Sequence, residues 1–497
     1  MVDILSTPIL VTIILGTVGL VIPIIDAMRK ERGASHRSYG SIAFGALIVS
    51  IFIILSRVLT GESIPAISFV DTAVLTEDMF GSFFAIVMLI VAIMVTVSSI
   101  EYMKKIPNPA PYYSLLLLSS IGMVLLAYSI DLVMLIVAWE LMSIPTYVLA
   151  GFHKRDPVSN EAAIKYFLFG ALSSGIIIYG ISLAYGLTGS TNIAVVLQGL
   201  VQIDAELQPI ALMALAMFIA GFGFKLALVP FHMWLPDTYE GAPTTVSTFL
   251  AAATKKAGFA AAFRVVILGM VALSLDWSIV LAILAILTMV IGNLAALTQK
   301  SMTRMLAYSS IGHAGYMLIG LSLAPYSVLA MQGSLFHILN HAVMKSAAFI
   351  ATAAVIVTLA TSNIDNFKGL GKRMPITALV MTVSLLALAG VPPLNGFWSK
   401  FILFASSIDA GSSVSWAPAL AIAGILTSAL SLGYYAWVIR KMYFEESPAA
   451  ETKRVKEPKV ILAVLIFALI FMVGFGIYPA PLIEFSSISV PPIAAVP

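Results

Sequence analysis

One pattern repeats along nearly the whole chain: apolar runs of about 20 residues alternate with short polar breaks. A helix of that length crosses the hydrocarbon core of a bilayer, where every backbone polar group must be satisfied within the protein. Fourteen such runs can be marked, and together they predict an all-α, polytopic membrane protein. They cover residues 8–25, 41–58, 80–100, 112–128, 131–151, 162–186, 209–231, 243–272, 277–297, 302–322, 326–358, 376–405, 417–439 and 460–477.

Composition excludes several other classes of protein. Of the 497 residues, 60% are hydrophobic and 10% are charged, whereas a soluble domain carries about 25% charged residues. A soluble globule and a disordered chain are therefore both excluded. The net charge of +3 gives no basic surface for nucleic acid. The chain has no cysteine, which excludes disulfides, cysteine-bound zinc and iron–sulfur clusters.

The basic residues predict the orientation of the chain. If the N-terminus lies outside, the connections on the cytoplasmic side hold 19 lysines and arginines, and the other side holds only Arg57. We also expect no cleavable signal peptide, because the apolar run Ile9–Ile25 lacks a basic start and a cleavage site. The cytoplasmic set comprises Arg29, Lys30, Arg32, Arg37, Lys104, Lys105, Lys154, Arg155, Lys300, Arg304, Lys368, Lys372, Arg373, Arg440, Lys441, Lys453, Arg454, Lys456 and Lys459.

The remaining basic residues fall inside the predicted spans, where a charge costs at least about 2.5–3.5 kcal/mol. They are Lys165, Lys225, Lys255, Lys256, Arg264, Lys345 and Lys400. Only one acid, Glu140, lies deep in a span, so ion pairs cannot account for all of these lysines. Snorkelling or a static salt bridge remains an alternative for any one of them. Several buried lysines that can switch between charged and neutral forms indicate a proton relay.

Two of these lysines lie beside helix-breaking residues. Pro230 follows Lys225, and Pro392–Pro393 precedes Lys400. Broken helices inside a membrane are typical of ion sites in transporters, although a packing kink is the alternative for each. The two breaks, and the five-span separation of Lys165 from Lys345, predict two inverted five-helix repeats. The expected units are an N-terminal segment (1–110), a first half (111–272), a second half (273–440) and a final loop and helix (441–497).

Five histidines also fall near or within the spans: His153 at a helix end, and His232, His313, His337 and His341. His337 and His341 share a helix face and could hold a metal or haem. No cysteine, carboxylate or haem-attachment signature stands beside them, so a hydrated polar track between lysines is favoured. Structural hydrogen bonding remains the alternative.

Five motifs resemble the antiporter-like proton-pumping subunits of respiratory complex I, especially the N subunit. They are AWELMSIPTY (138–147), EAAIKYFLFGALSSG (161–175), WLPDTYEGAPT (234–244), KKAGF (255–259) and GVPPLNGFWSKF (390–401). The resemblance covers residues from roughly 110 to 440.

The resemblance implies a role for each matching residue. Glu140 is expected to pair with Lys225, Lys255 to be the central relay lysine, Lys400 the terminal one, and Lys165 a lysine near the input path. Lys256, His232, His313, His337, His341 and Lys345 are further relay candidates.

The resemblance also implies that this chain holds no cofactor or metal. Flavin and iron–sulfur clusters are expected in partner subunits. The expected partners are other membrane subunits of a complex in a prokaryotic cell membrane. The electron donor stays open between NADH and a reduced deazaflavin. A multisubunit sodium/proton antiporter or a membrane-bound hydrogenase is the alternative, and a quinone- or haem-binding subunit is less favoured.

Overall fold

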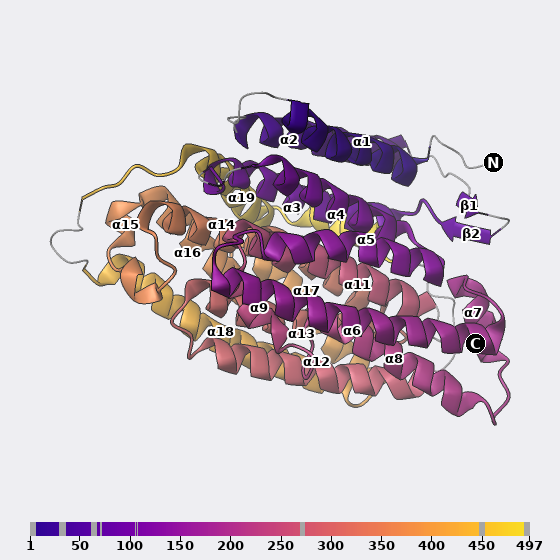
Figure 1. The fold of residues 1–497 in the computed structure, drawn as a ribbon. Coiled ribbons are helices and arrows are strands. Elements are labelled where there is room, and N and C mark those ends of the chain that lie inside the picture. Colours follow the sequence, from indigo (N-terminus) through magenta and orange to yellow (C-terminus); the bar gives the residue numbers. More distant parts are fainter. Residues whose placement is uncertain are drawn as a thin grey trace.

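The computed structural model describes residues 6–28, 36–60, 67–69, 72–104, 106, 108–268, 274–446 and 453–491. Over these ranges, the chain forms a bundle of long, roughly parallel helices, which confirms the predicted all-α class (Figure 1). Arg29, Lys30, Arg32 and Lys105, which entered the predicted charge asymmetry, lie outside the described residues.

Within the described ranges, eleven helices are long and apolar enough to cross a membrane. Each coincides with one of the predicted apolar runs. They are α1 (Thr7–Met28), α2 (His36–Thr60), α3 (Met79–Tyr102), α4 (Ala110–Tyr128), α5 (Leu132–Ala150), α6 (Pro157–Thr188), α8 (Gln208–Leu226), α12 (Ser274–Ala296), α14 (Val328–Leu359), α18 (Ala417–Phe444) and α19 (Lys459–Ile477).

The other three predicted runs are also helical, and two of them are irregular. Run 302–322 is the continuous helix α13 (Met302–Ser322). Run 243–272 is assembled from α10 (Thr244–Phe249), the π-helical turn η1 (Leu250–Thr254), α11 (Lys255–Phe263) and a second π-helical turn, η2 (Arg264–Leu268). Run 376–405 is split into α16 (Pro375–Ala389) and α17 (Asn395–Asp409).

One further run, 209–231, ends earlier than expected. Its helix α8 stops at Leu226, and the chain turns through an irregular segment before the short helix α9 (Trp234–Gly241). The remaining elements are β1 (Ile67–Phe69), β2 (Thr72–Leu75), α7 (Ile193–Val201), η4 (Ile364–Phe367), α15 (Leu370–Arg373), η5 (Ala410–Ser412) and α20 (Ala480–Ile488). The small antiparallel pair β1–β2 was not predicted, because three or four residues carry too little alternation to be recognised.

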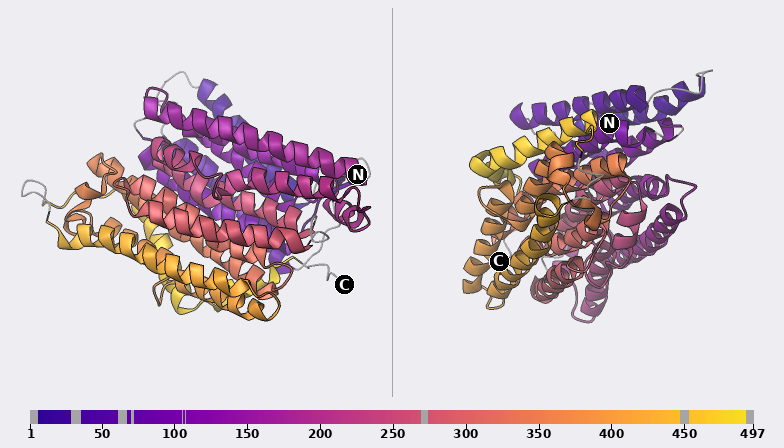
Figure 2. Two further views of the ribbon diagram at one scale, coloured as in Figure 1. Left: turned by 90° about the horizontal axis from the view of Figure 1, so that it is seen from below. Right: turned by 90° about the vertical axis from the view of Figure 1, so that its left-hand side faces the viewer.

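Helices α1 and α2 form one edge of the bundle, beside α4 and α3 (Figures 1 and 2).

Polar residues at the helix ends fix where the spans begin. Asp78 accepts a hydrogen bond from Gly81 N–H (2.7 Å) at the start of α3. Asp131 accepts from Val133 and Met134 N–H (both 2.9 Å) at the start of α5. These side chains satisfy amide groups that the first turn of a helix leaves without partners.

Two matching backbone bridges tie the first turn of a helix to the segment that follows the next helix. In the α5 bridge, Leu132 N–H and Ile193 N–H donate across the start of α5, at 2.8 and 3.0 Å. In the α13 bridge, Met302 N–H and Ile364 N–H donate across the start of α13, at 2.8 and 2.9 Å. The helix enclosed by each bridge, α6 or α14, has 32 residues. Helix α7 follows the first bridge and α15 follows shortly after the second, at opposite ends of the bundle (Figure 1).

Close helix packing depends on small residues, which let two backbones approach within the membrane. Gly122 of α4 shows this against α5. A Cβ atom added at Gly122 would lie 2.2 Å from Met142 N, which is backbone and cannot rotate away. By contrast, a Cβ added at Gly175 of α6 would meet nothing within 4 Å.

We therefore expect Gly122→Ala to destabilise the chain by about 1–3 kcal/mol, because it overpacks the α4–α5 contact. The matched variant Gly175→Ala adds the same methyl group to open space and should leave stability unchanged or slightly raised. Proteolysis of the chain at rising temperature, read by mass spectrometry in the purified membrane complex, measures both. Equal unfolding temperatures for the two variants would contradict this account of the α4–α5 contact.

Candidate functional site

The first helix break lies directly after Lys225. Ala227 adopts a left-handed conformation (φ +54°), and Pro230 lacks a backbone N–H. The Lys225 ammonium is buried and donates hydrogen bonds to Ser143 Oγ on α5 (3.1 Å) and Tyr166 OH on α6 (2.9 Å). The lysine beside the break is thus held by hydroxyl groups from two neighbouring helices.

The backbone at this break is satisfied by an aromatic side chain. Trp234, the first residue of α9, donates its indole N–H to Phe224 O (3.1 Å). Its ring stacks on Tyr166, with centroids 4.8 Å apart. Trp234, which follows the break, therefore contacts both the end of α8 and the tyrosine whose hydroxyl holds Lys225.

The second break separates α16 from α17, and the carbonyl groups at the end of α16 accept hydrogen bonds from a lysine. Lys400 Nζ, on α17, donates back to Leu388 O (2.8 Å) and Ala389 O (3.2 Å), and also to Ser428 Oγ on α18 (2.8 Å). These carbonyls form the negative end of α16, where a cation is favourable. Gly390 is left-handed (φ +88°), and a Cβ there would lie 3.0 Å from Lys400 Cδ, so glycine makes room for the lysine stem.

The expected ion pair between Glu140 and Lys225 is absent from the described structure. Glu140 Oε1 instead accepts a hydrogen bond from Ser174 Oγ of α6. Lys225 is held by the Ser143 and Tyr166 hydroxyls. In this conformation, each charged group has neutral partners on adjacent helices, and the pairing prediction is wrong for it.

Lys255 and Lys256 follow the π-helical turn η1 and make different contacts. Lys255 Nζ donates to Ser310 O of α13 (3.1 Å). Lys256 Nζ lies 2.7 Å from His341 Nδ1 of α14. Both lysines are fully buried, and the contact with a titratable side chain belongs to Lys256. Sequence reasoning had assigned the central position to Lys255.

The histidines continue from Lys256 towards the second break. The His341 and His313 rings lie 4.7 Å apart, measured between centroids. His313 Nδ1 lies 3.0 Å from His337 Nε2, and His337 Nδ1 lies 3.0 Å from Ser399 Oγ. Ser399 immediately precedes Lys400 on α17. The three histidines therefore form a buried track between Lys256 and the residue next to Lys400.

Two other candidates lie away from this track. Lys345 Nζ donates to Ser309 Oγ (2.6 Å), and Ser309 hydrogen-bonds to Tyr435 OH on α18. His232 lies in the first break, and its Nδ1 has no hydrogen-bond partner among the described residues.

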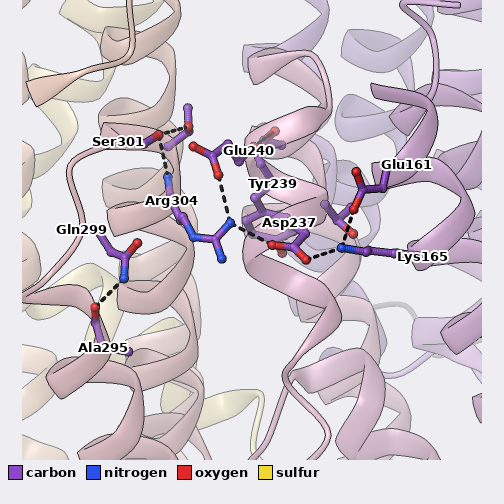
Figure 3. Close-up of polar contacts among 12 residues, drawn as sticks. Glu161, Lys165, Asp237, Tyr239, Glu240, Ala295, Gln299, Ser301 and Arg304 are labelled. Atoms are coloured by element: carbon purple, nitrogen blue, oxygen red, sulfur yellow. Dashed lines mark hydrogen bonds and ion pairs between the residues drawn. The ribbon is translucent and has the colours of Figure 1, made fainter. Parts of the chain in front are cut away.

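Lys165 is the least buried of the predicted site lysines, and it belongs to a charged cluster (Figure 3). Its Nζ lies 2.6 Å from both Glu161 Oε1 and Asp237 Oδ2. The other oxygen of Asp237 accepts from Arg304 Nη1 (2.8 Å), which also bonds Glu240 (2.9 Å). The side chains are about one-third exposed, except for Glu161, which is 63% exposed. Asp237 thus joins α6 to α13 through α9.

Arg264 falls inside a predicted span but is not isolated there. Its two terminal nitrogens donate to the carboxylate of Asp78, at 2.5 and 2.7 Å, and its guanidinium lies 4.7 Å from the Phe80 ring centroid. This bidentate pair joins η2 to the start of α3. The sequence could not predict it, because the partners are 186 residues apart.

Several site residues were not singled out in the sequence. The hydroxyls of Ser143, Tyr166, Ser174, Ser399 and Ser428 hold the charged groups, but serine and tyrosine are too common in apolar helices to stand out. Within the described residues, no group of three or more histidines, cysteines and carboxylates could hold a metal ion.

Comparison with known proteins gives one consistent family. The sequence model described as "NADH:quinone oxidoreductase/Mrp antiporter, TM" matches residues 129–431. The chain is 41% identical over 485 residues to F(420)H(2) dehydrogenase subunit N of Methanosarcina mazei, covering 95% of this chain and 96% of that one. It is 39% identical over 481 residues to NADH-quinone oxidoreductase subunit N of Trichlorobacter lovleyi, covering 95% and 94%.

Solved structures resemble the chain over almost its full length. A chain of respiratory complex I from Thermus thermophilus has a TM-score of 0.77 at 29% identity, covering 96% of this chain and 99% of that one. A chain of an archaeal membrane-bound sulfane sulfur reductase has a TM-score of 0.85 at 27% identity, covering 97% of both. A chain of the Mrp complex from Dietzia shares the fold, with a TM-score of 0.83 at 22% identity, covering 99% and 97%.

The charged cluster generates a stability prediction. We expect Asp237→Asn to destabilise the chain by about 1–2 kcal/mol, because it removes the carboxylate shared by Lys165 and Arg304. Glu161→Gln, which removes only one exposed pair within α6, should cost less than about 0.5 kcal/mol. Temperature-dependent proteolysis of the chain in the purified complex again measures both. If Glu161→Gln proved as destabilising as Asp237→Asn, Asp237 would not be the residue that joins the helices.

Proposed function

Because the chain belongs to the family of membrane subunits shared by NADH:quinone oxidoreductases and Mrp antiporters, we propose that it translocates protons through its buried lysines and histidines. Electron transfer in partner subunits drives the movement. The observation that carries the proposal is the row of buried lysines and histidines between the two helix breaks, in which Lys256 contacts His341 and His313 contacts His337. Lysines in a low-dielectric interior can exchange protons between charged and neutral forms at modest cost.

The first step of the relay runs from Lys225 to the lysines that follow η1. A Cβ at Gly258 of α11 would lie 3.2 Å from Lys225 Cγ, so this turn of α11 packs on the lysine stem. Lys255 lies one turn before Gly258 on the same helix. This packing of α11 on Lys225 is why we place Lys255 next in the relay.

The second step runs through Lys256 and the histidines to Lys400. Imidazole can accept a proton at one nitrogen and release it at the other, which suits a chain of rings in contact. In the described residues, His341 Nε2 and His313 Nε2 have no hydrogen-bond partner. Lys345 and His232 are further relay candidates outside this chain of contacts.

Glu140 supplies the switch. In the described conformation it bonds Ser174, while Lys225 bonds Ser143 and Tyr166. A second conformation, in which Glu140 pairs with Lys225, stabilises the charged lysine. Alternation between the two conformations loads and unloads Lys225 without redox chemistry in this chain.

The two breaks belong to two inverted halves, 111–272 and 273–440. The matching α5 and α13 bridges and the enclosed helices α6 and α14 of equal length support this division. The position of the breaks also supports this division, because one break follows α8 in the first half and the other separates α16 from α17 in the second.

The parent assembly is an oxidoreductase of the complex I type in a prokaryotic cell membrane. The subunit N relatives support this, and they are named as subunits of F(420)H(2) dehydrogenase and of NADH-quinone oxidoreductase. Flavin and iron–sulfur clusters belong to partner subunits. A multisubunit sodium/proton antiporter is the second candidate, favoured by the shared fold of the Mrp chain.

The relay predicts how charge removal affects pumping. Lys225→Met should lower proton transfer through this chain about 10²–10⁴-fold, because it removes a proton-transfer group. Glu140→Gln should hinder pumping similarly, and the double variant should be little worse than either single variant, because coupled residues are not additive. The proton-to-electron ratio in sealed vesicles of the assembled complex measures all three.

Lys300→Met is the matched control, because Lys300 is an exposed lysine in a connection. Its proton-to-electron ratio should equal that of the natural chain. An assembled Lys225→Met complex with an unchanged ratio would contradict the relay. An unchanged ratio in Glu140→Gln alone would contradict only the switch.

The orientation is tested separately, and the cysteine-free sequence provides the background. With the N-terminus outside, Ser412→Cys should react with a membrane-impermeant maleimide in intact cells, because Ser412 precedes α18 on the outer side. Glu446→Cys, beyond the other end of α18, should react only after the cells are opened. Both positions are exposed, so the reverse pattern would overturn the orientation.

A further inference from the structure

A cavity of about 470 Å³ lies beside Lys400, between α16, α17 and α18. This volume is within the range of small-molecule pockets. Of the fourteen residues that line it, only Lys400 and Ser428 have polar side chains. The cavity is therefore an apolar groove with one basic end.

The groove opens on the outer surface of the bundle. Phe401 and Ile408 of α17 are 55% and 58% exposed, and Ile425 of α18 is 51% exposed. Helix α18 lies at an edge of the bundle (Figures 1 and 2). An apolar surface of this kind suits contact with membrane hydrocarbon, which would give molecules access to the groove from the lipid phase.

The basic end of the groove carries no counterion. Lys400 Nζ bonds two backbone carbonyls and the Ser428 hydroxyl, all of them neutral. No ion pair to Lys400 exists in the described part of the chain. In surroundings of low dielectric, an unpaired ammonium attracts a carboxylate strongly.

We propose that this groove binds a long-chain carboxylic acid, with its hydrocarbon chain between α17 and α18 and its carboxylate on Lys400 Nζ. The acid enters from the lipid phase in its neutral form. When Lys400 is in the neutral form that the proposed relay gives it, the O–H bond of the acid breaks and the proton passes to the Lys400 amine. A carboxylate–ammonium pair remains, with no net change in charge. The carboxylate takes the place of the Ser428 hydroxyl.

Depth in the membrane favours a free acid over a phospholipid. Helices α16 and α17 have 15 residues each, so each is roughly 22 Å long. The break between them is therefore far from both membrane surfaces. A phospholipid headgroup stays at the surface, whereas a neutral carboxylic acid can enter the hydrocarbon.

The regulatory consequence rests on the proposed function. The bound carboxylate holds Lys400 in its charged form, so the lysine cannot release its proton. Long-chain acids then inhibit proton translocation from the lipid side.

The binding test uses a long-chain fatty acid with a diazirine in its chain, and the fatty alcohol of the same length with the same diazirine. After illumination of the purified complex, mass spectrometry locates the labelled residues. We expect the acid to label α17 and α18 about tenfold more than the alcohol, because only the acid forms the charged pair. This readout requires no turnover, so it stands or fails independently of proton pumping.

Three variants complete the test. Ala429→Phe fills the groove and should reduce labelling by the acid at least fivefold. Ala436→Phe is the matched control, because Ala436 is exposed two turns further along α18 and does not line the groove. Its labelling should not change. Lys400→Met should remove the preference for acid over alcohol. Equal labelling of the natural chain by acid and alcohol, or no loss with Ala429→Phe, would overturn the proposal.

Discussion

A helix that breaks inside a membrane leaves backbone carbonyls that water cannot reach, and each of them needs a donor from the protein. The two breaks of this chain meet that demand with two different side chains. At the first, the Trp234 indole donates to Phe224 O. At the second, the Lys400 ammonium donates to Leu388 O and Ala389 O. The buried Lys400 is thus part of the hydrogen bonding that satisfies the second break.

The same demand explains why the site is rich in hydroxyl groups and poor in carboxylates. Serine and tyrosine hydroxyls hold Lys225, Lys345 and Lys400. A carboxylate beside each lysine would fix its charge, and a neutral acceptor leaves the charged and neutral forms closer in free energy. The fixed pairs occur elsewhere: Arg264 with Asp78, and Lys165 and Arg304 with Asp237. These pairs join helices, and Lys225, Lys345 and Lys400 take no part in them.

The sequence predicted the helices well, because an apolar run of membrane length has few other ways to fold. Pro230 and Pro392–Pro393 also marked both breaks correctly. Neighbour relations were not predictable in this way. Which hydroxyl meets Lys225, and that Lys256 rather than Lys255 contacts a histidine, depend on how helices rotate and pack. The Glu140–Lys225 pairing came from resemblance alone, and the side chains make other contacts in the described conformation.

The two backbone bridges each join one end of a helix pair. Each bridge fastens a pair of helices together at one membrane face, and at the other face no bridge of this kind joins the same pair within the described residues. Because α7 and α15 mark opposite ends of the bundle (Figure 1), the two fastened faces are opposite. At the other face a short connection of the chain joins α5 to α6 and α13 to α14, so each helix pair is closed at both ends. Each pair can therefore move as one braced unit, and the backbone bridges of the two units lie at opposite faces of the bundle.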